Sequence, residues 1–322
     1  MRRGVYTVYT PPTEPIPPLI GIVGPTASGK TELALALART WPVEILVADS
    51  RQVYRGMDVG TAKPDAAARA AVPHHLLDLV DPDEPFTVAQ WVERARAALP
   101  EIAARGRIAL LVGGTGLYVS ALVDGHDYAA QPWAPEVRAR LADELEADGL
   151  ASLANRLAEL DPEAAARIDL RNPRRVLRAL ERAEAGGAGI APASEPYAGR
   201  VALVGISRPR HVLTSRIDAR AAWLFGNGLV EEVRALHDAG FGPELRPMTG
   251  HGYEEAARYL AGEWPLDRAI DVTARRTRQY AKRQRTWFGR DPRILWVPAG
   301  DRPADTPSVL DAAQRVLAAA VS

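Results

Sequence analysis

The chain has 322 residues, of which 47% are hydrophobic, and its 40 basic residues balance its 40 acidic ones. This length and composition are typical of a globular protein with one large domain or two, and zero cysteines exclude disulfides, thiolate catalysis and cysteine-ligated zinc. Because the charges balance, attraction to a nucleic acid would have to come from local clusters of arginine.

The amino-terminal segment carries no targeting signal that we can identify. Arg2 and Arg3 lead into no apolar signal-peptide core, and no apolar run approaches the roughly 20 residues of a membrane span. We therefore expect a cytoplasmic protein that does not contact a membrane. Residues 1–18 hold five prolines and little apolar patterning, which favours an extended or disordered lead-in.

The stretch from Leu19 to Thr31 predicts a strand, a glycine-bearing loop and the start of a helix. From Gly24 onward it has the spacing G-x-x-x-x-G-K-T of a phosphate-binding loop (P-loop). Backbone N–H groups would surround an anion, Lys30 would add a mobile charge, and the Thr31 hydroxyl would bind a magnesium ion. Because ATPases, kinases and other transferases share this loop, it predicts a polyphosphate ligand without identifying it.

A second predicted strand, Glu44 to Ala48, ends at Asp49. The carboxyl ends of strands in an open α/β sheet are where ligands bind, so Asp49 is a candidate site residue. It has two interpretations: a turn cap or magnesium-shell carboxylate, or a general base. The polar, aperiodic segment from Asp49 to Pro64 is predicted to be a long functional loop.

The next segments continue the alternation of strand and helix. A third apolar segment, His75 to Val80, is followed by a helix that Thr87 caps and by a strand at Ile108 to Val112. This alternation predicts an α/β, P-loop NTPase-like fold with a mostly parallel sheet flanked by helices.

Strand-like runs disappear from about Asp124 to residue 196. We predict helices at Pro135–Glu146, Leu150–Leu160 and Pro173–Glu184, and therefore an all-helical insertion domain at 124–196 within a catalytic core at 19–123 and 197–322. The core resumes with strands at Val201–Ile206 and Ile294–Val297 and with helices at His211–Phe225, Leu229–Ala239, Tyr253–Ala261, Leu266–Phe288 and Ser308–Ala320.

Two groups of arginines suggest anion binding. Arg216 and Arg220 lie four residues apart on one predicted helix and could clamp a diphosphate, or they could be solvated and paired with Asp218 or nearby acids. The second group is in the insertion, where a face rich in arginine suits RNA phosphates or is merely solvated. Its members are Arg167, Arg171, Arg174, Arg175, Arg178 and Arg182.

Together these motifs resemble the tRNA dimethylallyltransferases, which prenylate the adenosine 3′-adjacent to the anticodon. The resemblance runs in one collinear order from about Leu19 to Trp296. It rests on GPTASGKT (24–31), DSRQVYRGMDVGTAKP (49–64), LLVGGTGLY (110–118), NPRRVLRALE (172–181) and TRQYAKRQRTWF (277–288).

The resemblance implies roles for individual residues. Asp49 matches the general base for the exocyclic amine, and Arg220 matches an arginine that binds the diphosphate of dimethylallyl diphosphate together with Mg²⁺. The P-loop residues that would hold this diphosphate are Gly24, Pro25, Thr26, Ala27, Ser28, Gly29, Lys30 and Thr31. The positions that would meet the tRNA anticodon stem-loop are Asp49, Ser50, Arg51, Gln52, Thr115, Arg138, Arg174, Arg175 and Arg178.

The sequence departs from this family at TGHGYEE (249–255), where His251 precedes Gly252 and Tyr253, and at the glycine- and alanine-rich end of the insertion. Three alternatives stay open: an ATP-dependent small-molecule kinase, a prenyltransferase acting on free adenine nucleotides, and a non-catalytic RNA-binding protein. We expect the protein to act as a monomer.

Overall fold

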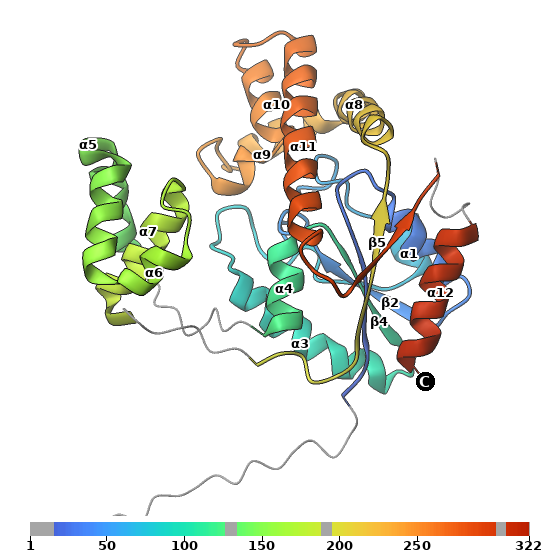
Figure 1. The fold of residues 1–322 in the computed structure, drawn as a ribbon. Helices are drawn as coiled ribbons and strands as arrows, with labels where there is room; N and C mark the ends of the chain where they lie inside the picture. The colour runs from blue at the N-terminus through green and yellow to red at the C-terminus, as the bar shows by residue number, and fades with distance from the viewer. Residues whose placement is uncertain (1–15, 126–133, 188–194, 301–306, 322) are drawn as a thin grey trace, which may run out of the picture. The chain divides into compact units, whose positions relative to one another are not determined.

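Figure 1 shows the computed structural model of the chain, which describes residues 16–125, 134–187, 195–300 and 307–321. Residues 1–15 of the expected lead-in, and residues 188–194 at the glycine-rich end of the insertion, lie outside the described residues. Contacts divide the chain into two compact units, one formed by Asp124–Pro196 and the other by the rest. Each unit is considered by itself below.

The larger unit is built on a parallel sheet whose six strands, within the described residues, follow the order β3-β2-β4-β1-β5-β6. This sheet confirms the predicted fold class. Of the third apolar segment, His75 to Val80, only His75 lies in the sheet, because Leu76 (φ 68°) and Asp78 (φ 55°) turn the chain away. The strands are β1 (Leu19–Val23), β2 (Val43–Ala48), β3 (His74–His75), β4 (Ile108–Gly113), β5 (Val201–Ser207) and β6 (Ile294–Pro298).

Helices cover both faces of this sheet (Figure 1). Alternate residues of β1 divide between the two layers. Ile20 and Ile22 pack with α1 (Lys30–Ala38) and α12 (Pro307–Val321), whereas Leu19 and Val23 pack with α3 (Val88–Ala104) and α4 (Gly116–Asp124). The capping box that Thr87 forms with Gln90 begins α3 (Val88–Ala104) where the sequence predicted. The prediction missed α2 (Ala66–Ala71) and α4 (Gly116–Asp124), the latter because glycines mark its start.

Four helices stand at the end of the sheet where the strands finish (Figure 1). All four were predicted, and a 3₁₀ turn at Arg246–Thr249 precedes the third. Their bounds are α8 (Arg210–Gly226), α9 (Leu229–Asp238), α10 (Tyr253–Leu260) and α11 (Leu266–Phe288). In the described ranges no helix is both long and apolar enough to cross a membrane.

The smaller unit is helical and has its own core. Its helices are α5 (Pro135–Leu160), α6 (Pro162–Arg167) and α7 (Pro173–Arg182), followed by a π-helical turn at Ala183–Gly187. Gly149 (φ 78°) breaks α5 close to the gap between the two helices predicted there, whereas α6 was not predicted. Leu141, Leu157 and Leu180 are fully buried between these helices.

The register of the central strands brings three chain segments to one place. Gly113 at the end of β4 pairs with Val23 of β1 on one side and with Ala48 of β2 on the other. A Cβ at Gly113 would lie 2.0 Å from the Ala48 carbonyl oxygen, so only glycine permits this approach. The P-loop, Asp49 and Gly114 therefore leave the sheet side by side.

A buried carboxylate near the amino-terminal end of β2 is held by two neighbouring side chains. Glu44 on β2 accepts hydrogen bonds from Arg105 Nε (3.0 Å) and Nη2 (2.7 Å), and it lies 2.7 Å from His75 Nε2. The hydrogen bonds from Arg105 lower the pKa of Glu44 to about 2 in spite of its burial.

This pairing predicts an acid-sensitive contribution to stability. Glu44→Gln should lower the unfolding free energy by about 1–3 kcal/mol at neutral pH, since the amide loses charge-assisted hydrogen bonds. The difference from wild type should shrink as the pH falls from 4.5 towards 2, because the carboxylate of the folded protein is protonated only there. Denaturant titrations of both proteins at several pH values measure this difference in unfolding free energy. Glu93→Gln, an exposed control on α3, should change stability by less than about 0.5 kcal/mol. A pH-independent Glu44→Gln effect would contradict the prediction.

Candidate active site

The P-loop leaves β1 in a conformation that glycine allows. Gly24 has φ 138° and Gly29, which precedes α1, has φ 95°. Lys30, the first residue of α1, donates from Nζ to the Pro25 carbonyl oxygen (2.7 Å). Burial lowers the pKa of Lys30 to about 8, and the Arg220 guanidinium adds to this effect while the Asp49 carboxylate opposes it. The loop therefore holds a cation whose charge lacks full compensation.

The two arginines of α8 have different roles at this loop. Arg216 donates from Nε to the Ala27 carbonyl oxygen (3.0 Å) and pairs with Glu32 (3.2 Å). Arg220 makes no hydrogen bond or salt bridge with any residue that the structure describes, and burial lowers its pKa. Asp218 pairs with Arg278 on α11. The alternative of arginines paired with Asp218 or nearby acids therefore describes Arg216, which pairs with Glu32, but not Arg220. Arg220 is thus available to an anion, whereas Arg216 holds the loop.

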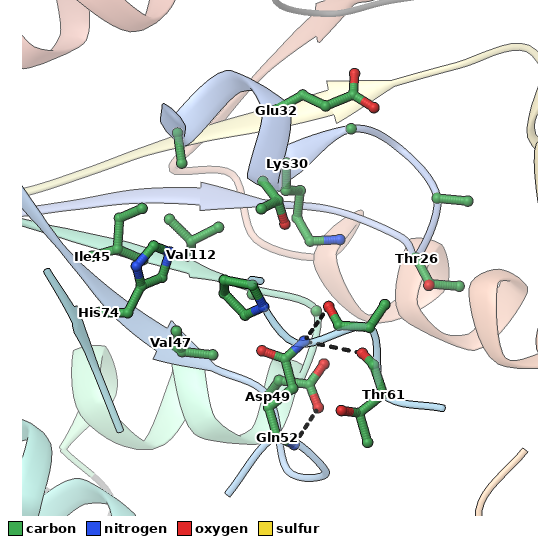
Figure 2. A pocket seen from close by; sticks show the side chains of 18 of the residues that line it. Thr26, Lys30, Glu32, Ile45, Val47, Asp49, Gln52, Thr61, His74 and Val112 are labelled. Carbon is green, nitrogen blue, oxygen red and sulfur yellow. Dashed lines mark hydrogen bonds between the residues drawn. The ribbon is translucent and has the colours of Figure 1, made fainter. Parts of the chain in front are cut away.

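Asp49 faces Lys30 from the end of β2 (Figure 2). Its Oδ1 accepts hydrogen bonds from the backbone amides of Arg51 (2.8 Å) and Gln52 (3.4 Å). No described residue donates a hydrogen bond to Oδ2. One oxygen therefore orients the carboxylate while the other can accept a proton.

The neighbouring candidates hold the chain around Asp49. Thr115 Oγ1 accepts from the Ser50 amide (3.0 Å), and Arg51 Nη1 donates to the carbonyl oxygens of Arg246 (2.9 Å) and Pro247 (3.0 Å). Gln52 Nε2 donates to the carbonyl oxygens of Thr61 (3.1 Å) and Ala62 (3.3 Å). The structure thus engages these side chains within the protein, which the sequence could not show.

A cavity of about 180 Å³ joins these groups (Figure 2). Lys30, Thr31 and Arg220 line it, as do Asp49 and Gln52, and Figure 2 shows Lys30 across the cavity from Asp49 and Gln52. His74 also lines it: its Nδ1 lies 2.8 Å from the Val72 carbonyl oxygen, and its buried Nε2 has no partner among the described residues. The remaining lining residues are Thr26, Ala27, Gly29, Glu32, Ala34, Ile45, Val47, Thr61, Ala62, Pro64, Val112, Gly113, Gly114 and Arg216.

The oxygen donors of the cavity fit a hard cation only in part. Thr31 and Glu32 border it, but the described residues contain no cluster of three or more acidic or histidine ligands. Mg²⁺ commonly takes few protein ligands and completes its shell with phosphate oxygens and water. The Thr31 hydroxyl fits such a shared ion.

Sequence reasoning missed Gln284 of α11, which ties two segments of the site together. Its Oε1 accepts from the Thr26 amide (2.8 Å) and its Nε2 donates to the Gly114 carbonyl oxygen (2.7 Å). One P-loop amide is therefore already bonded within the protein. Gln284 lies in the string TRQYAKRQRTWF, whose position opposite the P-loop appears only in the fold. Tyr280, one turn earlier, is buried, which raises its pKa to about 12.

The arginine-rich face of the smaller unit is mostly paired. Arg138 and Arg178 both bind buried Glu181, at 2.8 Å and 2.9 Å. Arg174 and Arg175 are exposed, and their side chains make no hydrogen bond or salt bridge with the described residues. Internal pairs hold Arg167 with Glu163, Arg171 with Asp169 and Arg182 with Asp161. The strongest unpaired charge on α7 is therefore the Arg174–Arg175 pair.

The chain is similar to proteins of one family over most of its length. Residues 52–291 match the model of the IPP transferase family, and residues 18–72 match that of isopentenyl transferase. A tRNA dimethylallyltransferase from Roseiflexus castenholzii is 45% identical over 93% of this chain and 97% of its own length. Another, from Heliobacterium modesticaldum, is 44% identical over 86% of this chain and 88% of its own length.

A solved structure agrees with these relatives. The tRNA isopentenylpyrophosphate transferase from Bacillus halodurans superimposes with a TM-score of 0.69 at 36% identity, over 94% of this chain and 96% of that one. The likeness thus includes the sheet, the helices at its carboxyl edge and the helical insertion.

The lowered pKa of Lys30 predicts that anion binding is coupled to protonation. Below pH 8 Lys30 is charged, and above it the free site loses this charge, so pyrophosphate affinity should fall as the pH rises past 8. At about pH 8.5 the bound anion should draw a proton onto Lys30. Calorimetry in buffers of different ionisation enthalpy measures this uptake. The Lys30→Met variant is the control, because its proton exchange on binding comes from the ionisation of pyrophosphate alone. Equal proton uptake by the wild-type protein and this variant would refute the coupling.

Proposed function

The chain belongs to the IPP transferase family, and from this we propose that it transfers a dimethylallyl group from dimethylallyl diphosphate to N6 of the adenosine 3′-adjacent to the anticodon in tRNA, releasing pyrophosphate. The observation that carries the assignment of roles is one cavity that is lined by the cations Lys30 and Arg220 and by the carboxylate of Asp49. The cations suit a reaction that produces an anionic leaving group. The Asp49 carboxylate, whose Oδ2 accepts no hydrogen bond from a described residue, suits removal of a proton.

The P-loop holds the diphosphate in this proposal. Gly29, Lys30 and Thr31 present the amino-terminal end of α1, where backbone N–H groups and the helix dipole attract anions. Lys30 and Arg220 neutralise the charge that grows on pyrophosphate as the bond between its oxygen and the allylic carbon breaks. A magnesium ion, which we assign to Thr31 and the diphosphate oxygens, would supply further positive charge.

Asp49 acts on the acceptor. The N6 lone pair of adenine is delocalised into the ring, so attack on carbon requires loss of an N6 proton. Oδ2 of Asp49 takes this proton as the N–C bond forms, while the bonds from the Arg51 and Gln52 amides to Oδ1 keep the carboxylate aimed. The step is balanced in this scheme: the N–C bond replaces the C–O bond, the N6 proton passes to Asp49, and pyrophosphate leaves with the electron pair of the broken bond.

The acceptor base must leave its stack to reach a cavity of this size. We assign the contacts with the phosphates of the anticodon stem-loop mainly to Arg174 and Arg175. Arg138 and Arg178 contribute less, because internal ion pairs already engage them. Ser50, Arg51, Gln52 and Thr115 shape the entrance near Asp49 and meet the target nucleotide there. The enzyme works as a monomer in the cytoplasm, where its tRNA acceptor is made.

One assay tests the assignment. The protein is incubated with Mg²⁺ and unmodified tRNA, with either dimethylallyl diphosphate or ATP, and pyrophosphate release and N6-prenyladenosine are measured. We expect both products from dimethylallyl diphosphate and tRNA. Release of ADP without prenylated RNA would replace this function by that of a kinase, and prenylation of AMP but not tRNA would replace the acceptor.

Asp49→Asn should separate chemistry from binding. The amide keeps an oxygen for the Arg51 and Gln52 amides but cannot take a proton, so kcat should fall by about 10²- to 10⁴-fold. Affinity for pyrophosphate, measured by calorimetry, should change by less than about threefold, because Asp49 lies across the cavity from the P-loop. Turnover near the wild-type rate would remove Asp49 from the role of base.

The insertion can be tested by charge removal at matched positions. Arg174→Ala with Arg175→Ala should weaken tRNA binding and lower the slope of log K against log salt by about 1 to 2. The control, Arg167→Ala with Arg171→Ala, removes the same charge from arginines that are already paired and should have a smaller effect. Filter binding at several salt concentrations measures both, and equal slopes for the two double variants would contradict the assignment.

A further inference from the structure

The wall of the cavity opposite the P-loop is a loop without regular secondary structure. Thr61, Ala62 and Pro64 line the cavity, and the carbonyl oxygens of Thr61 and Ala62 hold the Gln52 side chain. Gln52 in turn donates its backbone amide to Asp49 Oδ1. The direction of the Asp49 carboxylate therefore depends on where residues 58–62 lie.

Glu232 on α9 binds this loop through three consecutive backbone amides. Its Oε2 accepts from the amides of Asp58 (2.8 Å) and Val59 (2.6 Å), and its Oε1 accepts from that of Gly60 (3.1 Å). Hydrogen bonds to an ionised carboxylate are about twice as strong as neutral ones. This is the arrangement by which a carboxylate fixes the backbone of a turn.

Tyr253, the first residue of α10, completes the clamp. Its hydroxyl donates to Glu232 Oε1 (2.6 Å), and burial raises the pKa of Tyr253, so the hydroxyl keeps its proton. The ring lies flush against the loop: a Cβ at Gly60 would be 2.4 Å from Tyr253 Cε2. Only glycine at this position lets the ring and the carboxylate engage the loop together.

The other end of the loop is fixed from within. The buried Lys63 Nζ donates to the Tyr54 carbonyl oxygen (2.6 Å), to Asp58 Oδ1 (2.7 Å) and to Asp78 Oδ1 (2.6 Å). These contacts shape the loop but attach it to no helix at the carboxyl edge of the sheet. Glu232 and Tyr253 make that attachment.

We propose that Glu232 is a positioning residue for prenyl transfer: with Tyr253 it fixes the backbone of residues 58–60, and through Gln52 it fixes the direction of the Asp49 carboxylate. The expected loss of kcat rests on the proposed function. The hold of Glu232 and Tyr253 on residues 58–60 does not. Glu232 touches neither the P-loop nor the cavity, so its loss should affect the chemical step and spare the diphosphate.

Glu232→Gln tests this in the full-length protein. The amide replaces one acceptor oxygen by a donor that faces backbone N–H groups, so exchange of the Asp58, Val59 and Gly60 amides should accelerate by about tenfold or more. In the transfer assay kcat should fall by about 10- to 100-fold, the cost of a small misplacement, while KM for dimethylallyl diphosphate stays within about twofold. Glu231→Gln, an exposed neutralisation one residue away on α9, should match wild type.

A double variant shows whether the effect passes through Gln52. If Glu232 acts by way of Gln52, then Gln52→Ala with Glu232→Gln should be no slower than Gln52→Ala alone. Tyr253→Phe removes only a hydroxyl and serves as a second test if Glu232→Gln fails to fold. It should also accelerate amide exchange at residues 58–60 and lower kcat without raising KM, but by smaller factors. Wild-type kcat in the presence of faster amide exchange, multiplicative losses in the double variant, or a proportional rise in KM would each overturn the proposal. Failure of the wild-type protein to prenylate tRNA would instead refute the proposed function and leave the exchange result standing.

Discussion

The close approach of β2 and β4 at Gly113 is the constraint on which the site depends. With Val23 and Ala48 paired to the same glycine, the P-loop, Asp49 and Thr115 leave the sheet at one level and within reach of one another. A side chain at Gly113 would meet the Ala48 carbonyl oxygen and push β2 away from β4. The distance between the cationic and acidic sides of the cavity is thus set by backbone hydrogen bonds, which are stiffer than the side chains they position.

The cavity concentrates positive charge that the Asp49 carboxylate offsets only in part. Among the described residues, Lys30 Nζ bonds only to the Pro25 carbonyl oxygen and Arg220 makes no hydrogen bond or salt bridge, and burial lowers the pKa of both. Burying a charge costs free energy unless it is paired. Such a site is most stable with an anion in place, which is a physical reason why a loop shared with nucleotide-binding enzymes can hold any diphosphate that fits. The second substrate, and not the loop, decides the reaction.

Helices far along the chain hold the irregular segments of the site in place. Gln284 of α11 connects the P-loop to the end of β4, and Glu232 and Tyr253 connect the loop at residues 58–60 to α9 and α10. Arg51 reaches the 3₁₀ turn before α10. Loops cannot satisfy their own backbone groups as helices and strands do. Side chains from the carboxyl-edge helices supply the missing partners, and in doing so they make the site rigid.

The sequence by itself determined most of the elements, apart from α2, α4 and α6, and most of the charged groups of the candidate site. Glycine spacing marked the P-loop, hydrophobic periodicity gave the bounds of α11, and Asn172 with Pro173 marked the start of α7, because these signals act within a few residues. It could not show that Arg216 is committed to Ala27 while Arg220 stays available, or that Glu181 engages Arg138 and Arg178. It also missed Gln284 and Glu232. Their roles arise from contacts between residues more than 100 positions apart, and such contacts exist only once the tertiary structure has formed.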